Sequence, residues 1–412
     1  MMVQKNMYAT MTEELIQEIL YSEVKNATHL SSRRIHYLGL LLRSGVKWMS
    51  YLIFGGNTER PGKKRYLLSF LSKHKIDAPE LWERYDVIFR NDKRYKYFSR
   101  HLIAVEIRLL MAFLMGSPDF KRRLLVRCQE RMQALLQRYE FTGFLCGHPD
   151  LLTRFVGVVF HNQGKHVVTM QHGIYQLSSY KVLWFEKALA TKILVWGEAF
   201  KELYARQGVP EQALVVGAPN LSFVPDRSVE AGEPSEIKPV IIGQPFYKYH
   251  ARGKEMYNRW ITEMIVFFKA KGVTLTYRPH PRESVKSSLT SDNLKRVALD
   301  ASNRRVFMER YSVFYSITST LLIEVFLNRK RAVQFDIDID GKVYDRYAEY
   351  MQMPTITLDQ LDTHLASLKD YNFAYQEGYL NLVKDHHSYN VSVLVEALET
   401  PAGGVQKAEL PK

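Results

Sequence analysis

Short apolar segments alternate with amphipathic segments from Phe141 onward, and this alternation restricts the fold more than any other feature of the chain. The runs FTGFLC (141–146), HVVTM (166–170) and TKILVW (191–196) have strand length, and residues 151–164 and 198–209 have helical spacing. Strands that alternate with helices form parallel sheets, because a parallel connection needs a long crossover. The sequence therefore predicts an α/β fold.

The alternation occurs twice. Residues 220–239 are rich in Pro, Gly, Ser and Glu and read as a linker. The pattern then resumes with the run VIIGQPF (240–246), a helix from about Gly253 to Lys271, and strands near 274–277, 313–317 and 331–337. Two Rossmann-like domains facing a cleft are expected, preceded by a helix-rich region over residues 11–140.

The amino-acid composition restricts the classes of molecule that the protein is expected to bind. The formal net charge is +14, which favours phosphates, acidic glycans or an anionic membrane face. Nucleic acid is not expected, because the basic segment 91–100 lacks any recognised nucleic-acid-binding signature. The two cysteines, Cys128 and Cys146, provide neither a zinc quartet nor a disulfide framework. Acids near the start disfavour a signal peptide, so a cytoplasmic location is expected.

One apolar segment, Tyr37 to Phe54, approaches the length of a membrane span. Arg43, Ser44 and Lys47 lie in its middle, where charge is costly in a bilayer. We expect a buried helix of the N-terminal domain rather than a transmembrane helix. The alternative is a helix that lies in the membrane interface, peripheral to the inner membrane.

A His-Pro loop follows the run TLTY, in the segment TYRPHPRE (276–283). The two prolines around His280 fix their own φ angles and keep the preceding residues out of helix. Ligands bind at the carboxyl ends of strands in open α/β sheets. With Arg278 and Arg282 nearby, His280 and Pro281 are predicted to form part of an anion site.

Two residues are candidates for a general base. His172 follows the strand 166–170 and precedes a glycine, and a histidine with a pKa of about 6.5 can accept a proton at neutral pH. A structural histidine in a turn is the alternative. Asp150 is the second candidate, although a carboxylate just before a helix is also expected to be an N-cap.

Further donor-binding candidates follow two other strands. Gln244-Pro245 ends the first strand of the second domain, and a Ser-Thr segment, residues 316–320, begins a helix. Ser319 or Thr320 can cap that helix, and the hydroxyls of Ser316, Ser319 and Thr320 can also bind phosphate together with its free N–H groups. Glu324, one turn later, is predicted to bind a ribose hydroxyl or to form an ion pair.

The sequence does not indicate a metal-binding site. The acids of Asp336 to Asp340 lack the spacing of a calcium loop, so no metal or other cofactor is expected. The sequence has no GxxxxGK[ST] loop, no GxGxxG after a strand and no HExxH. ATPase, dinucleotide-dependent dehydrogenase and zinc protease functions are therefore disfavoured.

Taken together, Gln244-Pro245, His280-Pro281 and the Ser-Thr segment resemble motifs of the bacterial GT-B glycosyltransferases of surface polysaccharide synthesis. The resemblance covers roughly residues 240–335 and is closest to the lipooligosaccharide and capsule sialyltransferases. In that family the His-Pro and Ser/Thr motifs hold the cytidine monophosphate (CMP) of the donor. The resemblance implies a metal-independent enzyme with a nucleotide-sugar donor.

One motif departs from that family. The sialyltransferases carry an acidic pair followed by glycine in the first domain, whereas this chain has Gln171-His172-Gly173. That triplet, with Gly217-Ala218-Pro219, is more similar to the teichoic-acid glycerophosphotransferases and to capsule enzymes that transfer Kdo. The donor sugar is therefore left open between sialic acid and a Kdo-type sugar.

This resemblance implies an acceptor-binding domain at 1–222, a linker at 223–239, a donor domain at 240–385, and a C-terminal helix with a polar tail at 386–412. The leading hypothesis is an inverting glycosyltransferase acting on an anionic or lipid-linked glycan, such as lipopolysaccharide or capsule. The alternatives are a polyol phosphotransferase with a cytidine diphosphate (CDP)-linked donor, a sugar-nucleotide epimerase, and a non-catalytic basic protein that binds membrane or nucleic acid.

Overall fold

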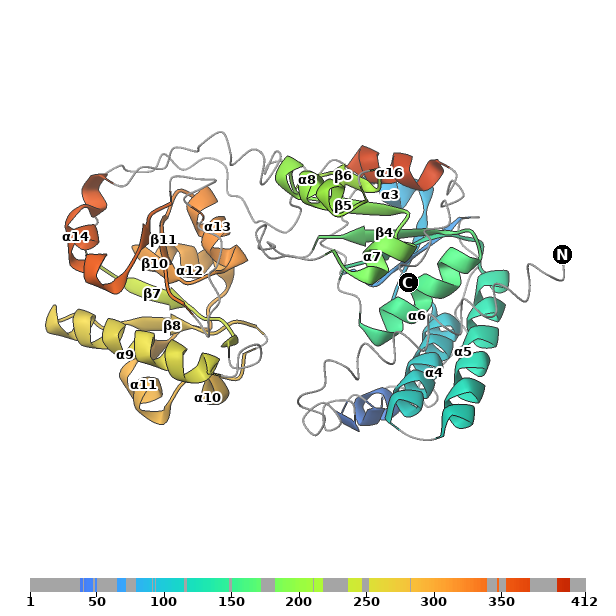
Figure 1. The fold of residues 1–412 in the computed structure, drawn as a ribbon, viewed down its shortest axis with the longest axis horizontal. Helices are drawn as coiled ribbons and strands as arrows, with labels where there is room; N and C mark the ends of the chain where they lie inside the picture. Colours follow the sequence, from blue (N-terminus) through green and yellow to red (C-terminus); the bar gives the residue numbers. More distant parts are fainter. Residues whose placement is uncertain are drawn as a thin grey trace.

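The computed structural model contains two α/β units, each built on a sheet of six parallel strands (Figure 1). It describes residues 38–39, 41–46, 49, 65–71, 79–90, 92, 94–114, 117–147, 150–171, 182–209, 211–217, 236–246, 252–281, 283–338, 347, 353–370 and 391–400. The predicted α/β class and the two-domain organisation are both confirmed.

The N-terminal sheet has the strand order β2-β1-β3-β4-β5-β6. Its strands are β1 (Tyr66–Ser69), β2 (Asp86–Phe89), β3 (Phe141–Cys146), β4 (His166–Met170), β5 (Lys192–Val195) and β6 (Ala213–Val215). The chain first places β2 on one side of β1 and then places β3 on the other side. The strand order therefore reverses at β1, and ligands bind at such reversal points in open α/β sheets.

Strands β1 and β2 were not predicted, because they lie in the region expected to be helical. Each is a run of four largely buried residues, YLLS and DVIF. Runs this short, in which the apolar residues are consecutive, show no alternation of period two, and periodicity alone does not separate them from a buried helix segment. The helices expected after them are present as α4 (Lys96–Leu114) and α5 (Pro118–Arg138).

Helices cover both faces of this sheet. They are α3 (Pro79–Arg84), α6 (Leu151–Asn162), α7 (Trp184–Leu189) and α8 (Glu198–Arg206), and α4 and α5 pack along each other and against α6. Gly164 and Gly208 follow α6 and α8 with φ angles of +63° and +87°. Glycine adopts this left-handed conformation at little cost, which is why it commonly follows the last turn of a helix.

The second sheet has the order β12-β11-β10-β7-β8-β9. Its strands are β7 (Pro239–Ile242), β8 (Thr276–Arg278), β9 (Ala298–Leu299), β10 (Val313–Ser316), β11 (Arg331–Phe335) and β12 (Thr355–Ile356). The α-helices of this unit are α9 (Gly253–Ala270), α10 (Val285–Ser288), α11 (Ser291–Arg296), α12 (Arg304–Arg310), α13 (Thr320–Leu327) and α14 (Leu361–Ala366). The strand order reverses at β7, which lies between β8 and β10.

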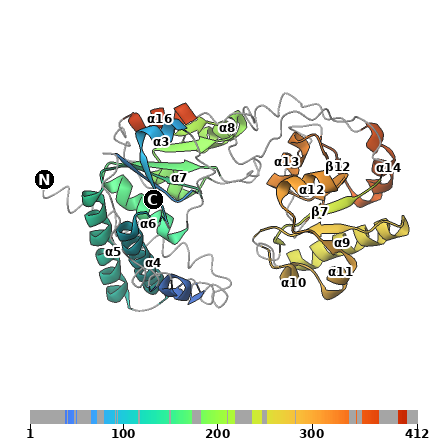
Figure 2. The same cartoon turned by 180° about the vertical axis from the view of Figure 1, so that it is seen from behind.

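The last described helix, α16 (Val391–Glu399), returns to the N-terminal unit. It packs against α3, and Leu394 and Leu398 join a buried cluster with Leu67 and Leu145 of the N-terminal sheet (Figure 2). Arg84 and Glu399 form an ion pair between the two helices. The sequence predicted a helix near this position but gave no sign of where it would pack.

Several expectations concern residues that the structure does not describe. The linker before residue 236, the tail after residue 400, and half of the segment from Tyr37 to Phe54 lie outside the described part. None of the described helices is long and apolar enough to cross a membrane. Cys128 and Cys146 are both buried and both free, as expected from their number.

The packing of α16 predicts that shortening one of its buried side chains destabilises the part of the protein against which it packs. Leu394 is fully buried, so Leu394→Ala is expected to cost about 2–5 kcal/mol because it leaves a cavity. Hydrogen exchange should then speed up in β1 and β3 but not in β10 and β11. Leu299→Ala is the control, since that leucine is 52% exposed; equal effects of the two substitutions would contradict the docking of α16.

Candidate functional site

Three loops named by the sequence motifs emerge side by side from the second sheet. They follow β7, β8 and β10, which are adjacent strands. Ile242 is paired with Arg278 and Ile241 with Tyr315, so the strands end at nearly the same level. The Gln-Pro loop (residues 243–245), the His-Pro loop (residues 279–283) and the start of α13 therefore share one edge, where the strand order reverses.

The His-Pro loop is held by Glu283, which the sequence motif includes but to which the sequence assigned no role. The backbone N–H of His280 donates to Glu283 Oε2 at 2.8 Å, and the N–H of Glu283 donates back to the His280 carbonyl at 2.8 Å. The hydroxyl of Tyr277 donates to Glu283 Oε1. Through Glu283, these hydrogen bonds connect the backbone of His280 to the buried Tyr277 of β8. They fix the backbone position from which the imidazole side chain extends.

Gly243 packs directly against this arrangement. A Cβ atom at this position would lie 2.5 Å from the Tyr277 hydroxyl oxygen and 2.6 Å from Glu283 Oε2. The backbone N–H of Gly243 also donates to the Arg278 carbonyl at 2.8 Å. The Gln-Pro loop and the His-Pro loop thus form one packed unit, and this contact requires a residue without a side chain.

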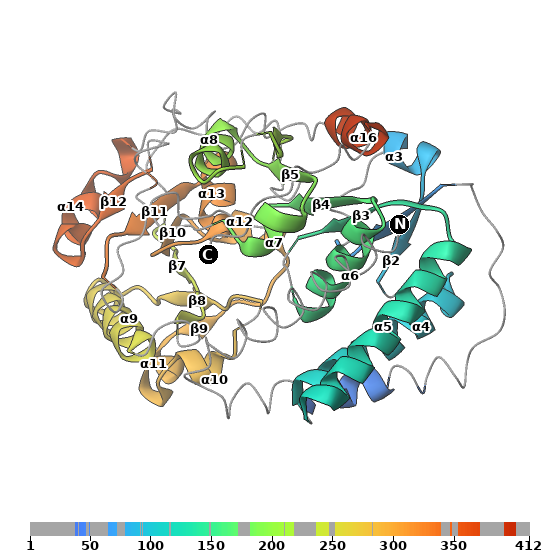
Figure 3. The same ribbon diagram turned by 45° about the vertical axis from the view of Figure 1, so that its right-hand side comes forward.

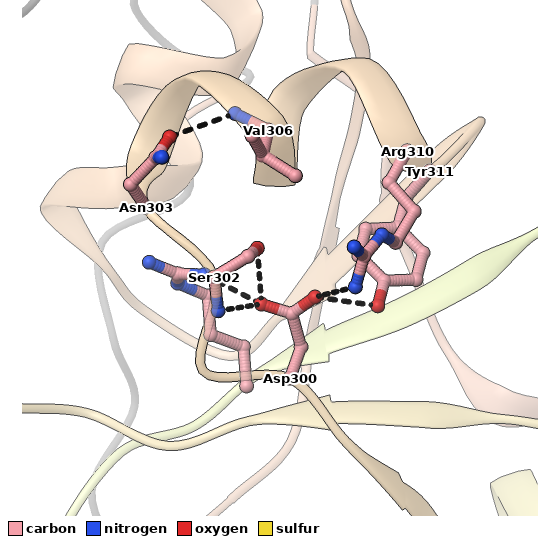
Figure 4. A network of polar contacts seen from close by, with 7 residues as sticks. Asp300, Ser302, Asn303, Val306, Arg310 and Tyr311 are labelled. Atoms are coloured by element: carbon pink, nitrogen blue, oxygen red, sulfur yellow. Dashed lines mark hydrogen bonds and ion pairs between the residues drawn. The ribbon is translucent and has the colours of Figure 1, made fainter.

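Arg278 is engaged by Asp300, the residue that follows β9. Figure 4 shows Asp300 with its other partners Ser302, Arg310 and Tyr311. Its guanidinium is 2.8 Å from Asp300 Oδ1, and its Cζ lies 4.1 Å from the centroid of the Phe307 ring. Asp300 also accepts hydrogen bonds from Tyr311 at 2.8 Å and from the Ser302 hydroxyl at 2.7 Å. The predicted anion contact of Arg278 remains a prediction, and the structure shows a structural role for this residue.

Asp300 is the centre of a charged network that the sequence did not reveal. Its side chain is fully buried, and Arg310 forms a second ion pair with it at 3.1 Å. Burial opposes ionisation of this carboxyl, but the hydrogen bonds from Ser302 and Tyr311 and the charge of Arg278 outweigh it, so its pKa lies below the ordinary value. The two ion pairs of Asp300 hold β8 and the end of β9 against α12.

The Ser-Thr segment divides into buried and half-buried residues. Ser316 is fully buried and donates to the Ile242 carbonyl at 3.1 Å, which fastens β10 to β7. Ser319 is the N-cap of α13 and accepts from the Leu321 N–H at 3.2 Å, as the sequence predicted for Ser319 or Thr320. Thr320 is the first residue of the helix and is half-buried.

Tyr347 covers the start of α13 and was missed by the sequence. Its hydroxyl oxygen accepts from the Ser319 N–H at 3.1 Å and lies 3.2 Å from Thr318 Oγ1. The Tyr347 N–H donates in turn to the buried side chain of Gln334 at 2.7 Å. No motif surrounds this tyrosine, so only the fold could bring it to the helix start.

The remaining donor-binding candidates have diverse surroundings. Glu324 is buried and forms an ion pair with Arg304 at 3.2 Å, which was one of its two predicted roles. Gln244 is half-buried, and its carbonyl accepts from the Phe246 N–H at 2.9 Å. Pro281 is exposed at the turn of the His-Pro loop.

In the N-terminal unit, Asp150 is the N-cap of α6. It accepts from the Thr153 N–H at 2.8 Å and pairs with Arg90 at 2.8 Å, and Arg90 also binds Glu106 at 2.6 Å. Burial opposes ionisation, but Arg90 and Thr153 prevail and hold the Asp150 pKa below its ordinary value. Such a carboxylate is a weak base, so the expected capping role is the better supported one.

His172 lies outside the described residues, and its role as a base stays a prediction. Its neighbour Gln171 is buried, and the Gln171 side chain accepts from the Trp196 N–H at 2.9 Å. This bond joins the ends of β4 and β5. Within the described residues, no group of three or more His, Cys, Asp or Glu side chains is arranged to hold a metal ion.

Comparison with known proteins gives matches among solved structures but none among family models or curated sequences. No protein-family model and no curated protein matches the chain. Among solved structures, S. aureus MnaA in a co-structure with UDP superposes with a TM-score of 0.51 and 12% identity, over 81% of this chain and 95% of the other. The chain has the GT-B fold.

A second GT-B neighbour is a putative UDP-N-acetylglucosamine 2-epimerase from Listeria monocytogenes. It has a TM-score of 0.50 and 12% identity, over 85% of this chain and 100% of the other. The UDP-GlcNAc 2-epimerase from Methanocaldococcus jannaschii also gives a TM-score of 0.50, with 10% identity over 81% and 99% of the two chains. At these identities the GT-B likeness concerns the fold alone, so donor and reaction need a separate argument.

The Asp300 network predicts a dependence of stability on pH. Asp300→Asn removes the charge that faces Arg278 and Arg310, and is expected to cost about 3–5 kcal/mol at pH 7. Because the folded-state pKa is lowered, the contribution of the carboxylate is present above its unfolded pKa of about 3.9 and is lost as pH falls through the folded value. The difference between wild type and variant in urea unfolding should therefore shrink below about pH 4.

The matched control is Asp362→Asn. Asp362 pairs with Lys271, but its side chain is 72% exposed, so this substitution should cost less than about 1 kcal/mol. An Asp300→Asn variant that behaves like this control would contradict the role of the network.

The contact at Gly243 predicts a strong response to one added methyl group. Gly243→Ala is expected to lower the free energy of unfolding by about 1–3 kcal/mol, because Tyr277 and Glu283 must move apart. Gly45→Ala is the control, since nothing lies within 4 Å of a Cβ atom there. Thermal unfolding measures both, and an unchanged Gly243→Ala would mean that the two loops are not packed as described.

Proposed function

We propose that this chain is a metal-independent, inverting glycosyltransferase that uses a nucleotide-activated sugar. The observation that carries the proposal is the meeting of the Gln-Pro loop, the His-Pro loop and the start of α13 at one edge of the second sheet. In open α/β sheets this edge binds nucleotides. Three sequence motifs of donor binding converge there from segments more than 30 residues apart in the chain.

The donor phosphate is proposed to lie between His280 and α13. The braced backbone of the His-Pro loop presents the imidazole beside β8, and the N-terminus of α13 offers a positive helix dipole one strand beyond β7. Both groups stabilise negative charge that develops as the nucleotide leaves. Arg278 supports the same edge through its pair with Asp300.

The transfer step needs a base on the acceptor side. An acceptor hydroxyl attacks the anomeric carbon, the bond to the nucleotide oxygen breaks with its electron pair, and the hydroxyl proton passes to the base. We assign that role to His172, which follows β4 in the N-terminal unit, because Asp150 has a lowered pKa and is engaged by Arg90. Attack from the face opposite the leaving group inverts the anomeric centre.

The proposed donors are CMP-linked sialic acid or a CMP-linked Kdo-type sugar, on the strength of the motif resemblance. The proposed acceptor is an anionic or lipid-linked glycan of a bacterial surface polysaccharide, which suits the net charge of +14. The epimerase reaction belongs to those structural neighbours, and a likeness in fold does not transfer it to this chain.

A thermal-shift panel with CMP, CDP, UDP, GDP and ADP, each with and without magnesium, tests the donor. A ligand at a hundred times its dissociation constant adds about 2.7 kcal/mol to the native state. We expect selective stabilisation by CMP that does not depend on magnesium. Selective CDP binding would indicate a polyol phosphotransferase, and conversion of a UDP-sugar without any acceptor would indicate an epimerase.

Substitution of the two histidines separates donor binding from transfer. His280→Ala is expected to weaken nucleotide binding about 10- to 100-fold, the effect of one hydrogen bond to a charged group. His172→Ala should retain nucleotide binding and lose turnover. The control is Lys286→Ala, an exposed residue just beyond the His-Pro loop. Nucleotide binding that survives His280→Ala unchanged would refute the proposed site.

A further inference from the structure

An apolar stripe is exposed on the helical residues between 38 and 49. Leu38, Leu42, Val46 and Met49 are 51%, 65%, 72% and 52% exposed. At about 100° per residue in an α-helix, positions separated by four, eight and eleven residues fall within an arc of about 80°. The four side chains therefore form one continuous face rather than scattered exposures.

The other side of this helical stretch is attached to the protein. Leu41 packs against the buried cluster that α4 and α5 share, and Ser44 is only 5% exposed. A surface helix ordinarily turns its apolar face inward. Here one face is already used for packing, and a second apolar face points outward, away from that cluster.

The stripe stands out from the rest of the described surface. The other exposed large hydrophobic residues among the described ones are Val126, Leu183, Val266, Leu299 and Val306, which lie on five different segments. Single exposed apolar residues are normal, whereas a contiguous exposed patch marks an interaction site.

Exposed basic residues lie on the same helical stretch as the stripe and on the start of the neighbouring helix α5. Arg43 is exposed on the same helical stretch, and Arg122, Arg123 and Arg127 are exposed on the first turns of α5. In Figures 1 and 3 the helical stretch, drawn in dark blue, lies at the end of the α4–α5 pair where α4 ends and α5 begins. Together α4 and α5 carry nine basic and three acidic residues, so the helix pair whose end lies beside the stripe is positively charged.

We propose that this face docks on the surface of an anionic lipid bilayer. An apolar stripe inserted at the boundary of headgroups and acyl chains, with basic residues at its rim, is how an interfacial helix binds such a surface. The charge argues against a second copy of the chain as the occupant, because two equally basic faces would repel each other. The inference does not depend on the proposed donor or reaction.

Co-sedimentation of the full-length chain with lipid vesicles tests it, without nucleotide, so that its outcome is independent of the proposed enzymatic function. Vesicles of phosphatidylcholine with about one third phosphatidylglycerol are compared with pure phosphatidylcholine. We expect binding to the anionic vesicles that falls as salt is raised, and much weaker binding to the neutral ones. Equal binding to both, or to neither, would overturn the proposal.

Matched variants locate the surface. The double substitution Leu42→Ser and Val46→Ser, and separately Arg123→Glu with Arg127→Glu, should each weaken vesicle binding at least about tenfold. The control pair, Val266→Ser and Lys269→Glu, changes an exposed apolar and an exposed basic residue on α9 in the other unit. These variants should bind as wild type does, and thermal unfolding verifies that every variant is folded.

Two results would assign the stripe to another occupant. If Leu42→Ser with Val46→Ser abolished a concentration-dependent dimer and left vesicle binding unchanged, a second copy would cover it. If the stripe variants lost thermal stability and kept full vesicle binding, another segment of the same chain would cover it. Either outcome refutes docking of this face on lipid.

Discussion

The candidate site depends on one contact, the seating of the Glu283 carboxylate against Gly243. Glu283 binds the Tyr277 hydroxyl and the His280 backbone N–H, and it can lie there only because Gly243 has no side chain. Through this contact the first strand of the second sheet positions the loop of its neighbour. A partly buried carboxylate whose two oxygens both accept hydrogen bonds is held rigidly, and a rigid loop can present an imidazole in one place.

Charged groups near the loop-bearing edge of the second sheet have two different roles. Asp300 neutralises Arg278 inside the protein, where an unpaired guanidinium would be costly. In the second pair the buried charge is the Glu324 carboxylate, which the more exposed Arg304 neutralises. Positive potential toward a ligand is then left to the helix dipole of α13 and to the imidazole of His280. A sequence that places arginine beside a His-Pro motif does not reveal this division, because pairing partners come from other strands.

The two units contribute differently to the proposed reaction. The second unit supplies a braced edge at the reversal of its strand order, and the N-terminal unit supplies a similar edge where Arg90 links Glu106 and Asp150 across the end of β1. The N-terminal unit also bears the basic α4–α5 pair and the exposed stripe at 38–49. The proposed donor edge in one unit and the proposed lipid-docking surface in the other would together suit an enzyme whose acceptor is anchored in a membrane.

The sequence by itself determined the α/β class, the position of most strands, the capping role of Ser319 and the three motifs of the site, because each rests on local periodicity or local backbone chemistry. Only the tertiary structure decided that β1 and β2 extend the first sheet, that α16 returns to α3, and that Asp300 and Tyr347 reach the site region. These features depend on contacts between residues far apart in the chain. Such contacts form when the whole chain packs and buries side chains that match in shape and charge. A short stretch of sequence contains only one partner of each contact and therefore does not reveal the pair.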